Sequence, residues 1–285
     1  MIGRHPTTGA PVVPGPTGLP IARNTALLSG AVAAHSGMQQ LFAAVGSITL
    51  VLALDVHGLL GLGPAIVLAA GALAAVPMGR WMDRSGRVPV LAGGFCVGAA
   101  GCGFAALGST ERSALLVIAG LVALGTANGA LLLARTAGGD MYPPERRARG
   151  IALVLFGSVF GAIVGPAVFS PLLAGRALEG DTLASLWLAA GGFELVGLAL
   201  VAAVRPDPKK IAVLLGHTPF ERTRRATPIG DLLRRPGVVP ALVAAQASLG
   251  VMVAVMTLTG TVVVDHLHHH SVFPIIGYTS SACTR

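Results

Sequence analysis

The chain has 285 residues, of which 53% are hydrophobic and only 11% are charged, and its mean hydropathy is +0.76. A soluble domain has about 25% charged residues, so this composition excludes an ordinary soluble protein and indicates a membrane protein. The formal net charge of +8 does not indicate a nucleic-acid partner, because the apolar runs leave the basic residues only short loops, where lipid headgroups explain them better.

The first 26 residues form a proline-rich leader with Pro6, Pro11, Pro14, Pro16 and Pro20. They lack the charged start, apolar run and cleavage site of a signal peptide, so we expect a disordered cytoplasmic leader at 1–26. Seven apolar runs of membrane-spanning length follow. They cover residues 27–54, 59–79, 88–108, 113–134, 148–173, 183–204 and 239–264. The predicted fold class is an all-α multi-pass membrane protein.

The basic residues predict the orientation of these runs. Seventeen of the 20 Lys and Arg residues lie in the leader and in the joints after the second, fourth and sixth runs. Cytoplasmic loops carry the excess of Lys and Arg, so we expect a plasma membrane protein with a cytoplasmic amino terminus. This orientation argues against a seven-helix receptor or a retinal protein. A retinal protein also needs a lysine in its last helix, whereas Lys209 and Lys210 fall in a predicted loop.

The joint from Gly79 to Arg87 carries four charges in nine residues. Gly79 would let the second helix approach a neighbouring backbone, and Gly86 would allow a tight reversal into the third helix. Asp83 can accept hydrogen bonds from guanidinium groups or from the amino end of a helix. With Arg84 and Arg87 it therefore forms a candidate conformational latch. A merely basic turn would explain the arginines but not the spacing of the glycines and the aspartate.

This joint resembles the G-x-x-x-D-R-x-G-R signature of the major facilitator superfamily of secondary transporters. The resemblance implies two six-helix halves, each built from 3+3 inverted repeats, with the solute between them. Residues 27–204 would then form the amino-terminal six-helix bundle and 205–238 the cytoplasmic linker. Residues 239–285 would hold the first helix of an incomplete second half and an irregular tail. We expect truncation or a frameshift near Gly277, where the apolar pattern of an eighth helix stops.

The joint after the fourth run, 135–149, matches the D-x-x-P-x-x-x-R pattern that the superfamily often has there, through Asp140, Pro143 and Arg147. In the family such charges commonly pair with those of the first joint. Arg135, Asp140 and Arg147 are therefore added to the predicted latch, with solvated loop charges as the alternative. Arg135 shares a helix face with Asn128, and we interpret it as the cytoplasmic anchor of that helix.

The fifth run has Gly157, Gly161 and Gly165 on one face, followed by Pro166. Small residues at four-residue spacing let helices approach closely, and proline bends a helix. The pattern resembles the G-x-x-x-G-P core found in drug/proton antiporters of the superfamily, although the two glycines that usually follow are absent. That resemblance implies proton-coupled efflux, and structural packing alone is the alternative.

Polar side chains at membrane depth are functional candidates, because burying them is costly. Glu194, near the middle of the sixth run, would favour its neutral form and is a candidate for proton coupling. A structural hydrogen bond to a neighbouring helix is the alternative. The first run carries a polar stripe expected to face a central cavity, and the fourth run adds one residue. These candidates for solute contact are Ser36, Gln39, Gln40, Ser47 and Asn128.

No enzyme is expected, since the chain offers no nucleophile, base and acid constellation and no phosphate-cradling loop. We also expect no cofactor and no functional metal site, because the histidine tract at 266–270 lacks companion ligands beyond Asp265. The predicted function is secondary active transport of a small solute by alternating access. Its partners would be the lipid bilayer, the solute and protons. The alternative is a non-transporting truncated membrane protein or a regulatory partner of a full-length transporter.

Overall fold

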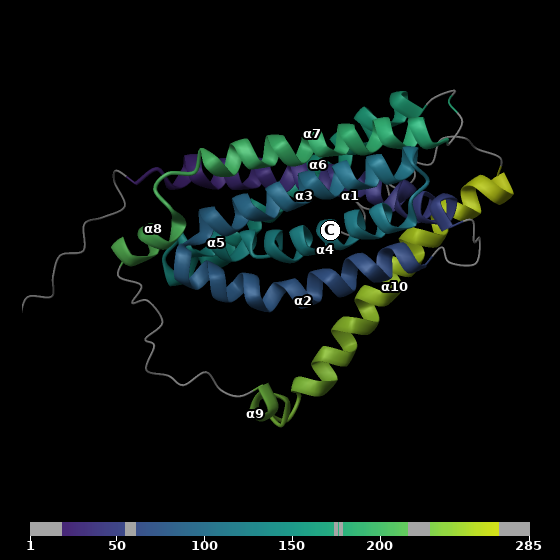
Figure 1. Ribbon diagram of the computed structural model, residues 1–285. Helices are drawn as coiled ribbons and strands as arrows, with labels where there is room; N and C mark the ends of the chain where they lie inside the picture. Colours follow the sequence, from purple (N-terminus) through teal and green to yellow (C-terminus); the bar gives the residue numbers. More distant parts are fainter. Residues whose placement is uncertain (1–18, 55–60, 174–175, 177–178, 216–228, 268–285) are drawn as a thin grey trace, which may run out of the picture.

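The computed structural model describes residues 19–54, 61–173, 176, 179–215 and 229–267. Within these ranges every regular element is a helix, as the composition predicts, and six spans are long and apolar enough to cross a membrane. They form one bundle (Figure 1). The spans are α1 (Ile21–Leu54), α2 (Leu62–Ser85), α3 (Arg87–Thr110), α4 (Ala114–Leu131) with α5 (Ala134–Asp140), η2 (Pro144–Arg146) with α6 (Arg147–Leu173), and α7 (Gly180–Ala202).

Three further helices follow the bundle: α8 (Pro208–Leu214), α9 (Ile229–Leu233) and α10 (Val238–Leu267). α8 lies beside α5, and α10 contacts α1 and runs obliquely to the other long helices (Figure 1). The predicted seventh run, 239–264, therefore lies within a helix. The side chains of Val243 and Val251 on it are exposed.

The charged joints are more helical than the sequence pattern predicted. α2 continues through the first joint to Ser85, and only Gly86 separates it from α3, which begins at Arg87. α5 replaces the first part of the loop expected after the fourth run and ends at Asp140. α1 begins at Ile21 rather than at residue 27, inside the predicted leader. Charged residues at a membrane surface fit a helix well, so they mark the membrane boundary without marking the helix end.

The pairing of the helices has an internal symmetry. α1 packs against α6 and α7, α4 packs against α2 and α3, and α3 packs against α7. Exchanging the triplet α1, α2, α3 with the triplet α4, α6, α7 leaves this set of pairs unchanged. An odd number of crossings separates α1 from α4, so the two triplets run in opposite directions through the bundle. This is the arrangement of two inverted three-helix repeats.

The crossing of α1 and α6 depends on the glycines predicted from the sequence. A Cβ on Gly157 would lie 2.0 Å from the carbonyl oxygen of Ser29, and one on Gly161 would lie 2.2 Å from that of Ala33. These distances leave no room for a side chain. Pro166 is buried one turn further along the same helix. Backbones in direct contact are typical of small-residue faces in membrane helices.

The symmetry-related crossing of α2 and α4 has the same construction. A Cβ on Gly125 would lie 2.4 Å from the carbonyl oxygen of Val67, and one on Gly129 would lie 2.5 Å from that of Gly71. Both repeats therefore use glycine where the first helix of one triplet meets the middle helix of the other.

Apolar side chains fill the bundle in two clusters. One surrounds Leu91, Phe95 and Met141 near the end that holds the α2–α3 joint, α5 and α8, which we call the charged end. The other surrounds Trp187 and the apolar residues packed on it toward the opposite end. The indole nitrogen of Trp187 donates a hydrogen bond of 3.1 Å to the Thr49 hydroxyl, so the polar atom of this buried ring is satisfied.

Candidate functional site

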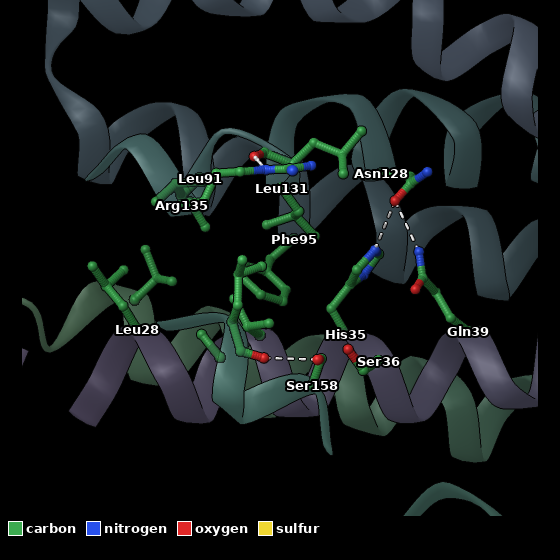
Figure 2. Close-up of a pocket in the computed structure, with 16 residues that line it drawn as sticks. Leu28, His35, Ser36, Gln39, Leu91, Phe95, Asn128, Leu131, Arg135 and Ser158 are labelled. Carbon is green, nitrogen blue, oxygen red and sulfur yellow. Dashed lines mark hydrogen bonds between the residues drawn. The ribbon is translucent and has the colours of Figure 1, made fainter. Parts of the chain in front are cut away.

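A cavity of about 160 Å³ lies between α1 and α4, with α3, α6 and α7 at its sides (Figure 2). Leu28, Leu91, Phe95 and Leu131 belong to its apolar lining. The side chains that give it polar character come from α1, α4, α5 and α6. They are His35, Ser36, Gln39, Asn128, Arg135 and Ser158. We call this cavity the α1–α4 pocket. A mostly apolar hollow with a few converging polar groups is the usual form of a small-molecule site.

A chain of hydrogen bonds leads from the pocket to a fully buried carboxyl group. His35 Nδ1 lies 2.8 Å from Glu194 Oε1, and Glu194 has no exposed surface. On the other side of the ring, His35 Nε2 lies 3.4 Å from Asn128 Oδ1. Gln39 Nε2 donates to the same oxygen at 2.8 Å, as Figure 2 shows. The carboxyl group of Glu194 is thus linked to two side chains that line the pocket.

The geometry limits where the protons of this chain lie. Asn128 Oδ1 can only accept, so His35 Nε2 carries a hydrogen. One proton then lies between His35 Nδ1 and Glu194 Oε1, on either atom. In both arrangements the pair has no net charge, which suits its burial within the bundle.

One oxygen of this carboxyl group has no partner. Glu194 Oε2 is buried and makes no hydrogen bond within the described part of the chain. A Cβ on Gly98 of α3 would lie 2.6 Å from this oxygen, so the glycine provides the space that the carboxyl group occupies. A buried acceptor without a partner is costly, which makes it a place where a further proton or a water molecule would be stabilised.

At the charged end, Arg87 joins the two predicted joints. Its Nε donates to Asp140 Oδ2 at 2.8 Å, and its Nη1 donates to the Met82 carbonyl at 3.2 Å. Asp83 Oδ1 lies 3.5 Å from Arg87 Nη1, but the Asp83 side chain is 79% exposed. The strong contact of Arg87 is therefore with Asp140, because that pair is shorter and better shielded from solvent.

Asp207 completes this end by capping two helices at once. Its carboxylate accepts from the backbone nitrogens of Arg87 and Val88 at 3.2 and 2.9 Å, and from that of Lys209 at 2.8 Å. These nitrogens begin α3 and α8, where helix N–H groups lack partners within the helix. Gly86 has φ +107°, and a Cβ on it would lie 2.8 Å from Asp207 Oδ2. The reversal at Gly86 therefore needs glycine for its backbone angle and for the space beside Asp207.

Lys209 binds the helix that ends at the same joint. Its Nζ donates to the carbonyl oxygens of Asp83 and Arg84, at 2.5 and 3.2 Å. These carbonyls belong to the last turn of α2, where a cation compensates the negative end of the helix dipole. α8 therefore fastens both sides of the α2–α3 joint through one carboxylate and one ammonium group.

Other residues of the predicted latch lie apart from these contacts. Among the described residues, a Cβ on Gly79 would meet no atom within 4 Å, so none of the described helices makes the expected close approach at this position. The side chains of Arg84 and Arg147 are exposed. Arg135 lines the α1–α4 pocket instead of joining Asp140. The sequence alone does not show whether a glycine on a helix surface, or an arginine at a membrane boundary, contacts a neighbouring helix.

The predicted solute-contact residues of α1 divide between two environments. Ser36 and Gln39 line the pocket. Gln40 is buried, and its Cβ lies 3.2 Å from the Cβ position of Gly165 in α6. Ser47 packs against α2, with its hydroxyl 3.4 Å from the Cβ position of Gly63. Only part of the predicted stripe therefore lines the pocket, because Gln40 and Ser47 pack where α1 crosses α6 and α2.

Two important residues were missed in the sequence, His35 and Asp207. His35 is an ionisable side chain inside an apolar run, so the criterion that selected Glu194 applied to it as well. Asp207 precedes Pro208, and an aspartate followed by proline is a helix-start signal. Neither signal indicates the partner, because His35 and Glu194 are 159 residues apart.

The described residues contain no group of three or more His, Cys, Asp or Glu side chains that could hold a metal ion. His268, His269 and His270 lie outside the described residues.

The sequence is similar to a known protein family and to several transporters. The sequence profile of the Major Facilitator Superfamily matches residues 57–283. The uncharacterized MFS-type transporter YddS of Bacillus subtilis is 28% identical over 74% of this chain and 48% of its own length. The riboflavin transporter RfnT of Brucella anthropi is 28% identical over 69% of this chain and 48% of its own length.

A gallate transporter of Pseudomonas putida is 32% identical over 35% of this chain and 23% of its own length. The chain spans about half the length of the first relatives it matches.

Proposed function

We propose that this chain, which belongs to the major facilitator superfamily of membrane transporters, carries a small solute through the α1–α4 pocket. One observation supports this most strongly. The pocket is joined by hydrogen bonds through Asn128 and His35 to the buried carboxyl group of Glu194. A purely structural hollow between helices would not need ionisable groups, which are costly inside a membrane.

We propose that the charged end faces the cytoplasm of a cell with this protein in its plasma membrane. Arg80, Arg84 and Arg87 lie at this end, and Arg146, Arg147 and Arg149 follow α5 there. Short loops rich in arginine stay on the cytoplasmic side. The amino terminus of α1 lies at the same end of the bundle and would be cytoplasmic as well.

We propose that Glu194 and His35 couple solute movement to protons. The pair holds one proton between them and has an unpartnered oxygen, Glu194 Oε2, that can receive another. A solute that contacts Asn128 or Gln39 would change the hydrogen bond on the far side of the imidazole ring. Proton and solute would then affect each other through the ring. Efflux, the direction that the α6 glycine motif predicts, belongs to the same proposal.

We propose that the latch at the charged end acts between conformations of the transporter. Asp83 supports this, because its carboxylate is 79% exposed and makes one long ion pair of 3.5 Å. It is free to bind another helix, whereas Asp140 is held by Arg87. The half of the relatives that this chain does not span is the natural source of that helix.

Uptake into proteoliposomes tests the transport proposal. Riboflavin and gallate are the first solutes to test, because two relatives are named as their transporters. We expect vesicles with the chain to take up one of them faster than protein-free vesicles, and we expect Asn128→Leu to abolish the difference. Equal rates with and without the chain would instead favour the second candidate, a non-transporting partner of a longer transporter, which the half-length match supports.

A further inference from the structure

Arg135 is the one residue lining the α1–α4 pocket that carries a permanent charge. No aspartate or glutamate lines the pocket, and His35, which also lines it, is engaged with Glu194. Within the described residues, no carboxylate forms an ion pair with Arg135. The pocket therefore contains a cation whose charge is not balanced by the helices around it.

The side chain of Arg135 is exposed, and it lines the open side of the α1–α4 pocket. Its Nε donates a hydrogen bond of 2.8 Å to the carbonyl oxygen of Leu132, three residues earlier (Figure 2). α5 ends at Asp140 at the charged end, so the side chain runs back along the span, away from that end. Arg135 itself precedes Asp140 by about 7.5 Å along a helix.

The guanidinium group keeps unused donors on the pocket side. Its hydrogen bond to Leu132 uses Nε, and the described contacts include none for its two terminal nitrogens. Nearby, the Asn128 amide nitrogen and the Ser36 hydroxyl also have no described partner. A planar fork of N–H donors matches a carboxylate, which accepts two parallel hydrogen bonds. These exposed donors line a mostly apolar pocket, where they can be offered to the charged group of an anion whose body fills the apolar part.

We propose that Arg135 binds the negatively charged group of the transported solute, and that the solute is a small monoanion with an apolar body, such as an aromatic carboxylate. The carboxylate would lie on the Arg135 guanidinium, and the ring would lie against Phe95 and Leu91, which line the same cavity. This rests on the proposed function, because it assigns a substrate class to the same pocket. A headgroup phosphate of an anionic lipid offers the same oxyanion chemistry, so the test must distinguish the two sources.

Titration calorimetry on the full chain in phosphatidylcholine nanodiscs tests this assignment, with benzoate and its neutral isostere benzamide as probes. We expect benzoate to bind, and benzamide to bind about tenfold more weakly or worse, because it lacks the charge. Arg135→Gln should weaken benzoate binding by about tenfold or more, while Arg135→Lys keeps part of it. The matched control is Arg149→Gln, which removes an exposed arginine at the charged end and should bind benzoate like the unchanged chain. Circular dichroism of each variant checks that the helices are retained.

Three results would overturn the assignment: no benzoate binding, equal binding of benzoate and benzamide, or unchanged benzoate binding in Arg135→Gln. Adding phosphatidylglycerol to the nanodiscs separates a lipid from a solute. If benzoate binding disappears in its presence, a lipid occupies Arg135 and the solute assignment is wrong. Failure of the transport proposal gives a different result. The proteoliposomes would then take up no solute, even if calorimetry shows that benzoate binds.

Discussion

The charged end and the α1–α4 pocket use similar side chains in opposite ways. At the charged end, the carboxylates of Asp140 and Asp207 and the cations of Arg87 and Lys209 all have partners within the described chain. In the pocket region, one oxygen of Glu194 has none. The first set fixes the ends of α2, α3 and α8 relative to one another. The second set has an acceptor that can still bind a proton, a water molecule or a solute.

This difference separates stability from function. Groups whose hydrogen bonds are filled by the protein should cost stability when they are removed. A buried group whose hydrogen bonds are left unfilled costs stability, so we assign such groups to binding or proton transfer. The contrast predicts that variants at the charged end unfold more easily, while variants in the pocket stay folded and lose activity.

Asp207→Ala should have the largest effect on stability. It removes the acceptor of three backbone nitrogens at the starts of α3 and α8, and we expect a loss of about 2 to 4 kcal/mol in the free energy of unfolding. Chemical unfolding in detergent, followed by circular dichroism, measures it. Asp231→Ala, on the exposed start of α9, is the control and should change little. If both variants unfold alike, Asp207 does not fasten this end.

Gly98→Ala should destabilise the chain through a single contact. The new methyl group would lie 2.6 Å from Glu194 Oε2, and overpacking of this kind costs about 1 to 3 kcal/mol. Because the clash is with one side chain, Glu194→Ala should relieve most of it. Comparing the two single variants and the double variant by unfolding measures this coupling. Additive effects would mean that Gly98 packs against something other than Glu194.

Glu194→Gln should separate proton coupling from folding. Glutamine keeps the size of the side chain and a hydrogen bond to His35 but cannot carry the transferable proton. We expect solute accumulation in proteoliposomes to lose its dependence on a pH gradient, while downhill exchange continues. Accumulation that still follows the gradient in this variant would remove Glu194 from the coupling mechanism.

Asp83→Ala should have the smallest effect on unfolding. Its carboxylate is 79% exposed and its ion pair with Arg87 is 3.5 Å long, so we expect a change below about 1 kcal/mol. A loss as large as that of Asp207→Ala would show that Asp83 is a structural residue of this half, and the latch proposal would lose its support.

Much of the fold follows from the sequence, because apolar run length and basic joints are local signals. The six spans, the reversal at Gly86 and the glycine face of α6 were predicted in this way. The pairing of His35 with Glu194 and the position of Asp207 beside α3 were not. Both depend on which helices become neighbours, and that is set by packing across more than a hundred residues.

The errors have the same origin. Gly79 was expected to touch a neighbouring backbone, but the glycines that do so include Gly125 and Gly129, for which no such contact was predicted. Glycine spacing alone does not tell which face of a helix meets a partner. Arg135 was interpreted as the cytoplasmic anchor of its helix from its position near the end of a run, and the structure adds that it also lines the pocket, which no local signal in the sequence indicated.

The central claim is that the α1–α4 pocket is a water-accessible solute site, and thiol labelling tests it most directly. Ser36→Cys places a thiol in the pocket, and Leu188→Cys, on an exposed apolar part of α7, is the control. Both are made in a chain whose native cysteines are replaced by alanine. The label is a membrane-impermeant thiol reagent, which reacts with thiolates, and thiolates form in water. We predict labelling of the Ser36→Cys variant about tenfold or more faster than the control, and slower in the presence of benzoate. Equally slow labelling of both variants would contradict the claim.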